Sequence, residues 1–391
     1  ASRVRDTLGL NIDTWRTEDG YADFGPVLEK VQELQLRHAR VNMSATGGAW
    51  GLSRLQGLGK LGVRLDLVMG DAFGRYGTAP YSTLDRRLRN AVMPYVDSLE
   101  GTNEPDLAKD EDDWASVARE HQEQVVRSAA ARRGKPVAVV APSVGRIANV
   151  PALGDLAALA DAGNAHAYSS AEEPSAPMDE WLRTLRSQVP GGTPTLITEA
   201  GFQDDLSQTK WHSPLPPEIA ADYVPRTILE AMRRGIPRVY LYEMINRWSD
   251  PFHIDTAAHF GLLDHELRPK PAWASLVRLQ SALIDGGRPD RDVAPLRATV
   301  DEGPGDLRTL AFRRRDGSAA IAIWRSVSQW DSQAQTRKPV DGEPVRITVE
   351  GAVDGALVTD VVSGERRRLS GPGGLIDVDV AGAPIVVDGI R

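Results

Sequence analysis

Short apolar runs alternate with longer segments of helical periodicity over roughly the first three quarters of the chain. The runs are rich in Val, Ile and Leu, which favours buried strands. The segments between them repeat apolar residues every three or four positions, as at Val27, Val31 and Leu34, which favours amphipathic helices. We predict strands at 8–14, 40–44, 64–70, 97–102, 136–144, 164–169, 195–202 and 238–246. We predict helices at 24–39, 50–61, 82–96, 113–133, 150–162, 178–188, 217–234 and 272–283.

This alternation between residues 8 and 284 has the size and rhythm of a (β/α)8 TIM barrel. A doubly wound open sheet is the structural alternative. It would favour a glycine-rich phosphate loop after the first strand, and the stretch LGLNIDTW at 8–15 contains none. We therefore predict an α/β fold in which residues 1–285 form a (β/α)8 barrel that carries the catalytic site.

The pattern changes after residue 285, where helical periodicity gives way to β-rich runs. These runs lie at 308–315, 319–325, 345–350, 356–362 and 375–380. Closely spaced short strands separated by turns are typical of a sandwich. We predict that residues 286–391 form a small all-β sandwich domain, packed on the outer helices of the barrel and without catalytic residues. Trp324 and Trp330 are predicted to be packing residues.

Composition limits the possible functions. The chain has 391 residues, which favours two domains, and 41% hydrophobic with 26% charged residues is usual for a soluble globular protein. A net charge of −8 and the lack of a basic run with interleaved aromatics argue against nucleic-acid binding. The absence of cysteine excludes disulfides, thiol catalysis and cysteine-based metal sites. No apolar run approaches the roughly 18 residues of a membrane span.

The chain begins with ASRVRD, without a methionine or a signal segment. Both a mature form after leader removal and a trimmed chain fit this start. We expect a secreted or cell-surface protein, with a cytoplasmic location left open, and we expect it to be a monomer.

Two strands run directly into a glutamate. Glu104 follows the strand at 97–102 and precedes Pro105, which cannot donate to a ladder and so ends the strand there. Glu199 ends the run TLIT and is followed by Ala200 and Gly201. The two residues are about three β/α units of ~30 residues apart, so they belong to strands four and seven and face one another across the barrel mouth. A pair of carboxylates at one mouth is what cleavage of a glycosidic bond requires.

The two motifs, Asn103-Glu104-Pro105 and Thr198-Glu199-Ala200-Gly201, resemble the acid/base and nucleophile motifs of clan A retaining glycoside hydrolases. The stretch FGLLDHELRPKPAW at 260–273 resembles the segment between strand eight and helix eight of family 39 and related members. A C-terminal β-sandwich also fits that group. The resemblance covers residues 8 to 284 and implies a barrel enzyme that hydrolyses a polysaccharide or glycoconjugate by double displacement.

The resemblance also implies roles for residues around the two glutamates. Glu104 would be the acid/base and Glu199 the nucleophile, with Arg40 and Tyr168 bound to Glu199. His166 resembles the strand-six histidine of the clan, and Asn103 would donate to the sugar hydroxyl next to the reacting carbon.

Further candidates for substrate binding come from strand eight and its loops. Glu243 lies at the end of strand eight and would accept from a sugar hydroxyl or pair with Arg247. Trp211 and Trp248 lie in the loops after strands seven and eight, where aromatic faces could bind pyranose rings. We predict no cofactor and no metal, since His253 and His259 with Asp250 or Asp255 match no standard ligand spacing.

Two other functions remain open from the sequence. A catalytically silent carbohydrate-binding protein would keep the cleft and lose a catalytic group, although both glutamates are present. A metal-assisted barrel enzyme would need a ligand cluster at the strand ends, and the histidines here lie mostly in one loop. The separation of the two carboxyl groups distinguishes these possibilities.

Overall fold

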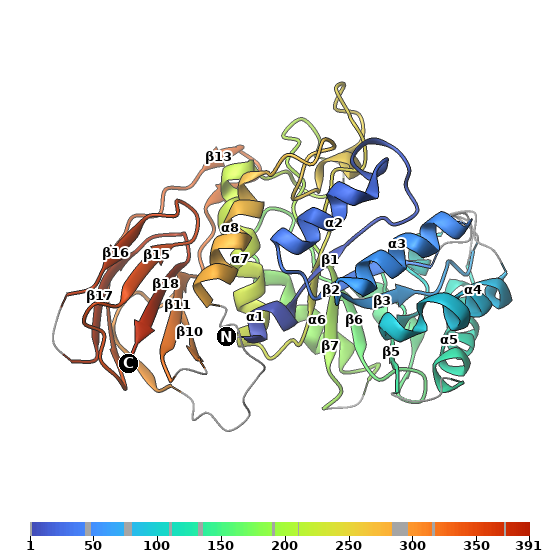
Figure 1. The fold of residues 1–391 in the computed structure, drawn as a ribbon, viewed down its shortest axis with the longest axis horizontal. Helices are drawn as coiled ribbons and strands as arrows, with labels where there is room; N and C mark the ends of the chain where they lie inside the picture. The colour runs from blue at the N-terminus through green and yellow to red at the C-terminus, as the bar shows by residue number, and fades with distance from the viewer. Residues whose placement is uncertain are drawn as a thin grey trace.

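A barrel of parallel strands and a neighbouring pair of antiparallel sheets make up the fold (Figure 1). The computed structural model describes residues 2–43, 48–73, 80–108, 112–131, 136–189, 192–209, 211–283, 296–314, 317–370 and 373–391. None of the helices in these ranges combines the length and the apolar composition of a membrane-spanning segment.

The barrel sheet contains eight parallel strands within the described residues, in the order β5-β4-β3-β2-β1-β8-β7-β6. They are β1 (Leu8–Asn11), β2 (His38–Asn42), β3 (Arg64–Val68), β4 (Val96–Glu100), β5 (Ala138–Val140), β6 (Gly163–His166), β7 (Thr195–Ala200) and β8 (Val239–Leu241). The ends of the sheet meet where Val140 bridges Ala162 and the Ala141 amide donates to the Ala162 carbonyl oxygen at 3.0 Å. The sheet therefore closes, and the predicted (β/α)8 barrel is confirmed.

Helices surround this barrel and cover its apolar outer face (Figure 1). They are α1 (Ser2–Thr7), α2 (Phe24–Glu33), α3 (Gly48–Lys60), α4 (Tyr81–Arg87), α5 (Trp114–Ala130), α6 (Ala176–Leu185), α7 (Pro217–Arg233) and α8 (Pro271–Leu283). Short 3-10 helices lie at Asp19–Tyr21, Met93–Tyr95, Pro105–Leu107, Ile147–Leu153 and Thr256–His259, and a π-helical turn lies at Leu88–Val92.

Three predicted helices differ from the structure. The helix expected at 82–96 is α-helical only over Tyr81–Arg87 and continues as the π-helical turn Leu88–Val92 and the 3-10 helix Met93–Tyr95. The helix expected at 24–39 ends at Glu33, because Gln35 adopts a left-handed conformation (φ 48°) that terminates it before β2. The α-helix expected at 150–162 is instead the 3-10 helix Ile147–Leu153 followed by turns. Pro151 lies inside that segment and lacks the N–H that an α-helical hydrogen bond needs.

The C-terminal region is a sandwich of antiparallel sheets. Its described strands are β9 (Ala298–Glu302), β10 (Leu307–Arg313), β11 (Ala319–Arg325), β12 (Trp330–Asp331), β13 (Thr336–Arg337), β14 (Glu343–Val349), β15 (Leu357–Asp360), β16 (Arg366–Arg368), β17 (Leu375–Val380) and β18 (Ile385–Ile390). They form a sheet β10-β11-β18-β15-β16, a sheet β17-β14-β9 and a small hairpin β12-β13. Ile321, Ile347 and Ile376 help to fill the core between the two larger sheets. The predicted sandwich is confirmed; its predicted boundary at residues 285 and 286 lies outside the described residues.

The sandwich packs directly on α7 and α8, as Figure 1 shows. β11 is buried on both faces: Ile321 and Ile323 belong to the sandwich core, whereas Ala322 and Trp324 join the core of the barrel. On the other side of this contact, residues 219–232 of α7 are buried all round. A helix with no solvent-exposed face must pack against other elements on both sides. Here the barrel packs on one side of α7 and the sandwich on the other.

Hydrogen bonds link the two parts across this contact. The Trp324 indole N–H donates to Glu230 Oε1 of α7 at 2.7 Å, and the Trp330 indole N–H donates to the Pro214 carbonyl oxygen at 3.1 Å. The backbone amide of Gln329 donates to the Tyr223 hydroxyl at 2.7 Å. The two tryptophans are packing residues, as predicted.

Replacing Trp324 by alanine should lower the free energy of unfolding by about 3–5 kcal/mol, because it removes a buried ring and the donor to a buried carboxylate. Denaturant unfolding followed by circular dichroism measures the change. Trp211→Ala is the matched control, since this side chain is 80% exposed, and it should change stability by less than about 0.5 kcal/mol. Equal unfolding midpoints for the two variants would contradict the proposed role of Trp324.

Candidate active site

The two predicted catalytic glutamates lie at the C-terminal rim of the barrel. Glu199 is part of β7, whereas Glu104 lies beyond the end of β4 and caps the 3-10 helix Pro105–Leu107. Its backbone is left-handed (φ 42°, ψ 55°), and its N–H donates to Ser143 Oγ at 3.1 Å. Such a conformation is uncommon for a residue other than glycine, and backbone strain of this kind clusters at functional sites.

His166, at the end of β6, brings the two carboxylates together. Its Nδ1 lies 2.7 Å from Glu104 Oε1 and 3.4 Å from Glu199 Oε2. A nitrogen or oxygen atom from each of these three side chains lies within 4.8 Å of the others. Burial would lower the pKa of His166, but the charges of Glu199 and Glu104 outweigh it and raise that pKa above its ordinary value.

Glu199 is held by two donors. Arg40 Nη1 donates to Oε1 at 2.6 Å, and the Tyr168 hydroxyl donates to Oε2 at 2.8 Å. Burial alone would raise the pKa of Glu199, but His166, Arg40 and the Tyr168 hydrogen bond outweigh it and hold the pKa below its ordinary value. The site therefore keeps Glu199 ionised.

The principal partner of Arg40 is Glu100, which the sequence analysis did not identify as a site residue. Arg40 Nε and Nη2 donate to the two oxygens of this carboxylate, both at 2.8 Å. Asn164 Nδ2 donates to Glu100 Oε1 at 2.9 Å. Glu100 is fully buried at the end of β4, and a buried strand acid was itself a signal, because such a charge needs a partner.

Asn103 is oriented by the same guanidinium. Its Oδ1 accepts from Arg40 Nη2 at 2.6 Å. Because a guanidinium can only donate, the amide oxygen faces Arg40 and the amino group is directed away from it. Arg40 thus contacts both Glu199 and the residue that precedes Glu104.

An aromatic wall supports Tyr168 beside Glu199. The His212 ring stacks on the Tyr168 ring with centroids 4.4 Å apart, and Phe260 meets Tyr168 edge-on at 5.9 Å. The nearby Gly201 is required because a Cβ there would overlap the Tyr242 carbonyl oxygen. His212 comes from the loop after β7, so the aromatic wall depends on the position of that loop.

Glu243 lies after β8 and pairs with Arg247, one of the two partners predicted for it. Arg247 Nε donates to Glu243 Oε1 at 3.2 Å. Burial raises the pKa of Glu243 to about 8, with the Arg247 charge opposing and the Asp13 charge adding to the rise. A carboxyl group in this state is largely protonated at neutral pH.

The two predicted aromatic binding residues lie in different settings. Trp248 and Trp15 both contact the guanidinium of Arg16, whose Cζ is 4.8 Å from each ring centroid. Arg16 also pairs with Asp13, which lies near Arg247, so Trp248 belongs to the neighbourhood of Glu243. Trp211 is largely exposed on the loop after β7. A substrate-binding role remains a prediction for both tryptophans.

The group Glu104, His166 and Glu199 also has ligand types that bind metal ions. Here a guanidinium already occupies one oxygen of Glu199 at 2.6 Å. A second cation on the same carboxylate would be repelled by Arg40, so the geometry favours acid–base chemistry over metal-assisted chemistry at this position.

Solved structures of carbohydrate-active enzymes share this architecture over nearly the whole chain. A family 39 glycoside hydrolase from the gut symbiont Bacteroides cellulosilyticus WH2 aligns with 100% of this chain and 82% of its own, at 15% identity and a TM-score of 0.66. The fold is that of the family 39 glycoside hydrolases. This confirms the predicted resemblance at the level of the fold.

Two further structures support the same fold. A monomeric β-xylosidase from Caulobacter crescentus CB15 aligns with 99% of this chain and 97% of its own, at 15% identity and a TM-score of 0.62. A family 51 arabinofuranosidase from Xanthomonas axonopodis pv. citri aligns with 99% and 96%, at 11% identity and a TM-score of 0.63. No protein-family model and no curated protein sequence matches the chain. At these low sequence identities the structural similarity shows the fold alone. The reaction has to be inferred from the geometry of the site.

The free energy of unfolding should decrease between about pH 5 and pH 8, and replacing Glu243 by glutamine should make this decrease smaller. The folded protein binds a proton at Glu243 up to pH about 8, whereas the unfolded chain releases it near pH ~4.3, so stability falls as pH rises through this window. Glutamine has no such proton. Urea unfolding at several pH values measures the difference, and parallel curves for the two proteins would contradict the raised pKa.

Proposed function

We propose that this protein is a retaining glycoside hydrolase that cleaves a polysaccharide or glycoconjugate by double displacement. Glu199 is the nucleophile and Glu104 the acid/base. The observation that carries the proposal is the convergence of these two carboxylates on His166, with side-chain oxygen and nitrogen atoms of all three residues within 4.8 Å of one another.

This separation bears on the stereochemistry of the reaction. Retaining enzymes hold their carboxyl groups about 5–5.5 Å apart, whereas inverting enzymes hold them about 6.5–9.5 Å apart to admit a water molecule. The close approach of Glu104 and Glu199 supports the retaining arrangement.

The surroundings of the two glutamates support different roles. Glu199 receives Arg40 and Tyr168, which favour its ionised form, as a nucleophile requires. Glu104 is more accessible, with its side chain 24% exposed, and it lies beside the titratable His166. An acid/base must exchange protons with the leaving group and then with water, and this position suits that exchange.

The fold relatives suggest the first substrates to test. The Caulobacter structure is described as a β-xylosidase and the Xanthomonas one as an arabinofuranosidase, so aryl β-xylosides and aryl arabinofuranosides are the first substrates to test. In this proposal the amino group of Asn103 donates to the sugar hydroxyl next to the reacting carbon. A panel of polysaccharides then tests internal against terminal cleavage.

Replacing Glu199 by glutamine should abolish turnover of every substrate, including those with good leaving groups, because no covalent intermediate can form. Release of the aryl alcohol from an activated aryl glycoside measures this. Glu180→Gln, an exposed carboxylate on α6, is the control and should leave the rate unchanged. Substantial turnover by the Glu199 variant would contradict its role. Sugar binding by the unmodified protein without any hydrolysis would instead favour a silent carbohydrate-binding protein.

Replacing Glu104 by alanine should lower kcat/KM by about 10²–10⁴-fold for substrates whose leaving group needs a proton. Activated aryl glycosides should instead show a burst of aryl alcohol followed by slow hydrolysis, because only the second step still needs a base. Added azide needs no base, so it should restore turnover and yield a glycosyl azide of retained configuration. An azide product of inverted configuration, or rescue of the Glu199 variant instead, would overturn the assignment of roles.

A further inference from the structure

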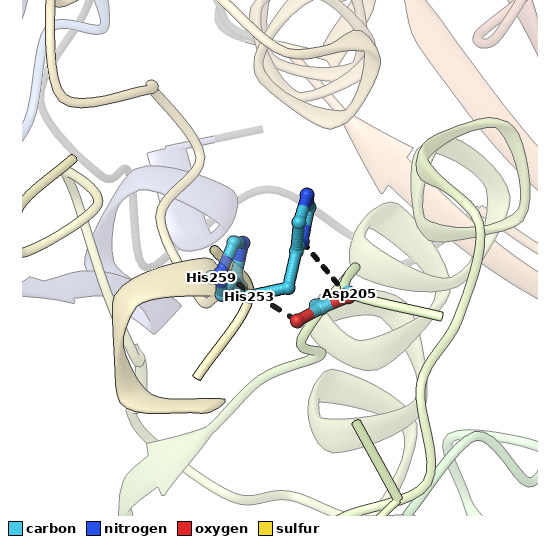
Figure 2. A group of neighbouring side chains, drawn as sticks. All are labelled: Asp205, His253 and His259. Carbon is cyan, nitrogen blue, oxygen red and sulfur yellow. Dashed lines mark ion pairs between the residues drawn. The ribbon is translucent and has the colours of Figure 1, made fainter. Parts of the chain in front are cut away.

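A second cluster of metal-binding side chains lies in two rim loops, away from the glutamate pair. Asp205 comes from the loop after β7, and His253 and His259 come from the loop after β8. Figure 2 shows the two imidazole rings beside one another, with the Asp205 carboxylate directed toward both. The rings are nearly parallel, with centroids 5.5 Å apart and planes at 11°.

The candidate ligand atoms lie close enough together to surround one ion, since one atom from each of the three side chains lies within 4.8 Å of the others. His253 Nδ1 lies 3.1 Å from Asp205 Oδ1, and His259 Nε2 lies 3.7 Å from Asp205 Oδ2. His259 Nε2 also forms a hydrogen bond with Asp250 Oδ2 at 3.1 Å, and a bound ion would replace that hydrogen bond. Ligands at 2.0–2.1 Å from a tetrahedral zinc ion lie about 3.3–3.4 Å from one another, so these distances bracket the expected value.

Asp205 provides an independent sign that a cation belongs here. The residue is 4% exposed, and its Oδ1 accepts from the amide and hydroxyl of Ser207. Its Oδ2 is buried and has no hydrogen-bond partner within the described ranges. A buried carboxylate oxygen in this state is costly, and a metal ion between it and His259 would satisfy it.

Surrounding groups would orient the ligands. Asp250 is fixed by the backbone amides of Ile254 and Asp255, at 3.2 and 2.9 Å. His259 Nδ1 faces Asp204 at 3.9 Å, and Lys270 Nζ lies 2.8 Å from the other oxygen of Asp204. A carboxylate behind a ligating histidine is a common arrangement, because it sets the tautomer and the direction of the ring.

We propose that Asp205, His253 and His259 bind a divalent transition-metal ion, with zinc as the best fit, and that Asp250 adds its negative charge beside His259. Two imidazoles with carboxylates suit zinc, whereas calcium and magnesium prefer sets of oxygen ligands. The sequence predicted no metal because the two histidines and their neighbouring acids lie in one loop, whereas Asp205 comes from the other.

The ion would tie the two loops together beside the catalytic rim. The Asp205 amide donates to Gln203 Oε1 at 2.8 Å, and Gln203 Nε2 donates to the His212 carbonyl oxygen at 2.9 Å. The His212 ring in turn stacks on Tyr168, which holds Glu199. The metal would therefore position the aromatic wall. This consequence rests on the proposed function, whereas metal binding itself does not.

The test is to treat the whole chain with a chelator and then titrate it with zinc chloride alone, without any sugar. Calorimetry measures the heat of binding during the titration. We expect saturable binding of one zinc ion per chain and a melting temperature that rises with zinc concentration. Calcium and magnesium should bind far more weakly. No saturable zinc binding, or preference for calcium, would overturn the proposal and leave the direct His253–Asp205 and His259–Asp250 contacts as the explanation.

Two conservative variants test whether the ion binds at the proposed ligands. His253→Asn keeps a residue that tolerates the left-handed backbone at this position (φ 53°), and Asp205→Asn keeps an oxygen for Ser207. Each should weaken zinc binding by about 100-fold or more, since loss of an outer partner alone costs 10–100-fold. His265→Ala, a histidine outside the cluster, should bind zinc like the unmodified chain. Unchanged affinity in His253→Asn would overturn the assignment even if Asp205→Asn failed to fold.

Discussion

The active-site rim depends on one buried guanidinium. Arg40 lies between Glu100 and Glu199, and all three residues are almost inaccessible to solvent. Removing such charges from water is costly unless each has a partner with good geometry, and the two-pronged contact with Glu100 provides it. Burial and the neighbouring Glu100 also raise the pKa of Asp66 to about 8, which keeps a further negative charge out of this centre at neutral pH. Glu199 can thus be ionised because Glu100 has already fixed the guanidinium in place.

One β/α unit links the catalytic rim to the rest of the molecule. β7 carries Glu199, the loop after it carries Asp205 and His212, and α7 lies under the sandwich. A helix buried on both sides has little freedom to shift, because interiors are close-packed. The sandwich therefore packs against the helix that follows the strand of Glu199. The proposed metal would hold the intervening loop at its other edge.

The barrel elements could be read from the sequence because they depend on local patterns. Apolar runs and helical periodicity are repeated within each segment. Most differences are shifted ends, as at Gln35, where one residue ended a helix, but around Pro151 the predicted α-helix is a 3-10 helix. The strand-end positions of Glu104 and Glu199 were likewise local, since parallel strands of a closed barrel end at one rim. The contacts of Arg40 and Tyr168 with Glu199 followed from the family resemblance.

By itself the sequence determined the fold class, the sandwich and the rim that carries the two glutamates, because each follows from short-range pattern and from the geometry of a parallel barrel. Only the tertiary structure decided which buried charges meet. Glu100 of β4 and Arg40 of β2 pair across the intervening strand β3, and Asp205 meets His253 and His259 from a different loop. Side-chain direction and loop conformation determine which charged groups meet. A displacement of a few ångströms decides whether a buried carboxylate has a partner or none. Neither side-chain direction nor loop conformation produces a repeating pattern in the amino-acid sequence.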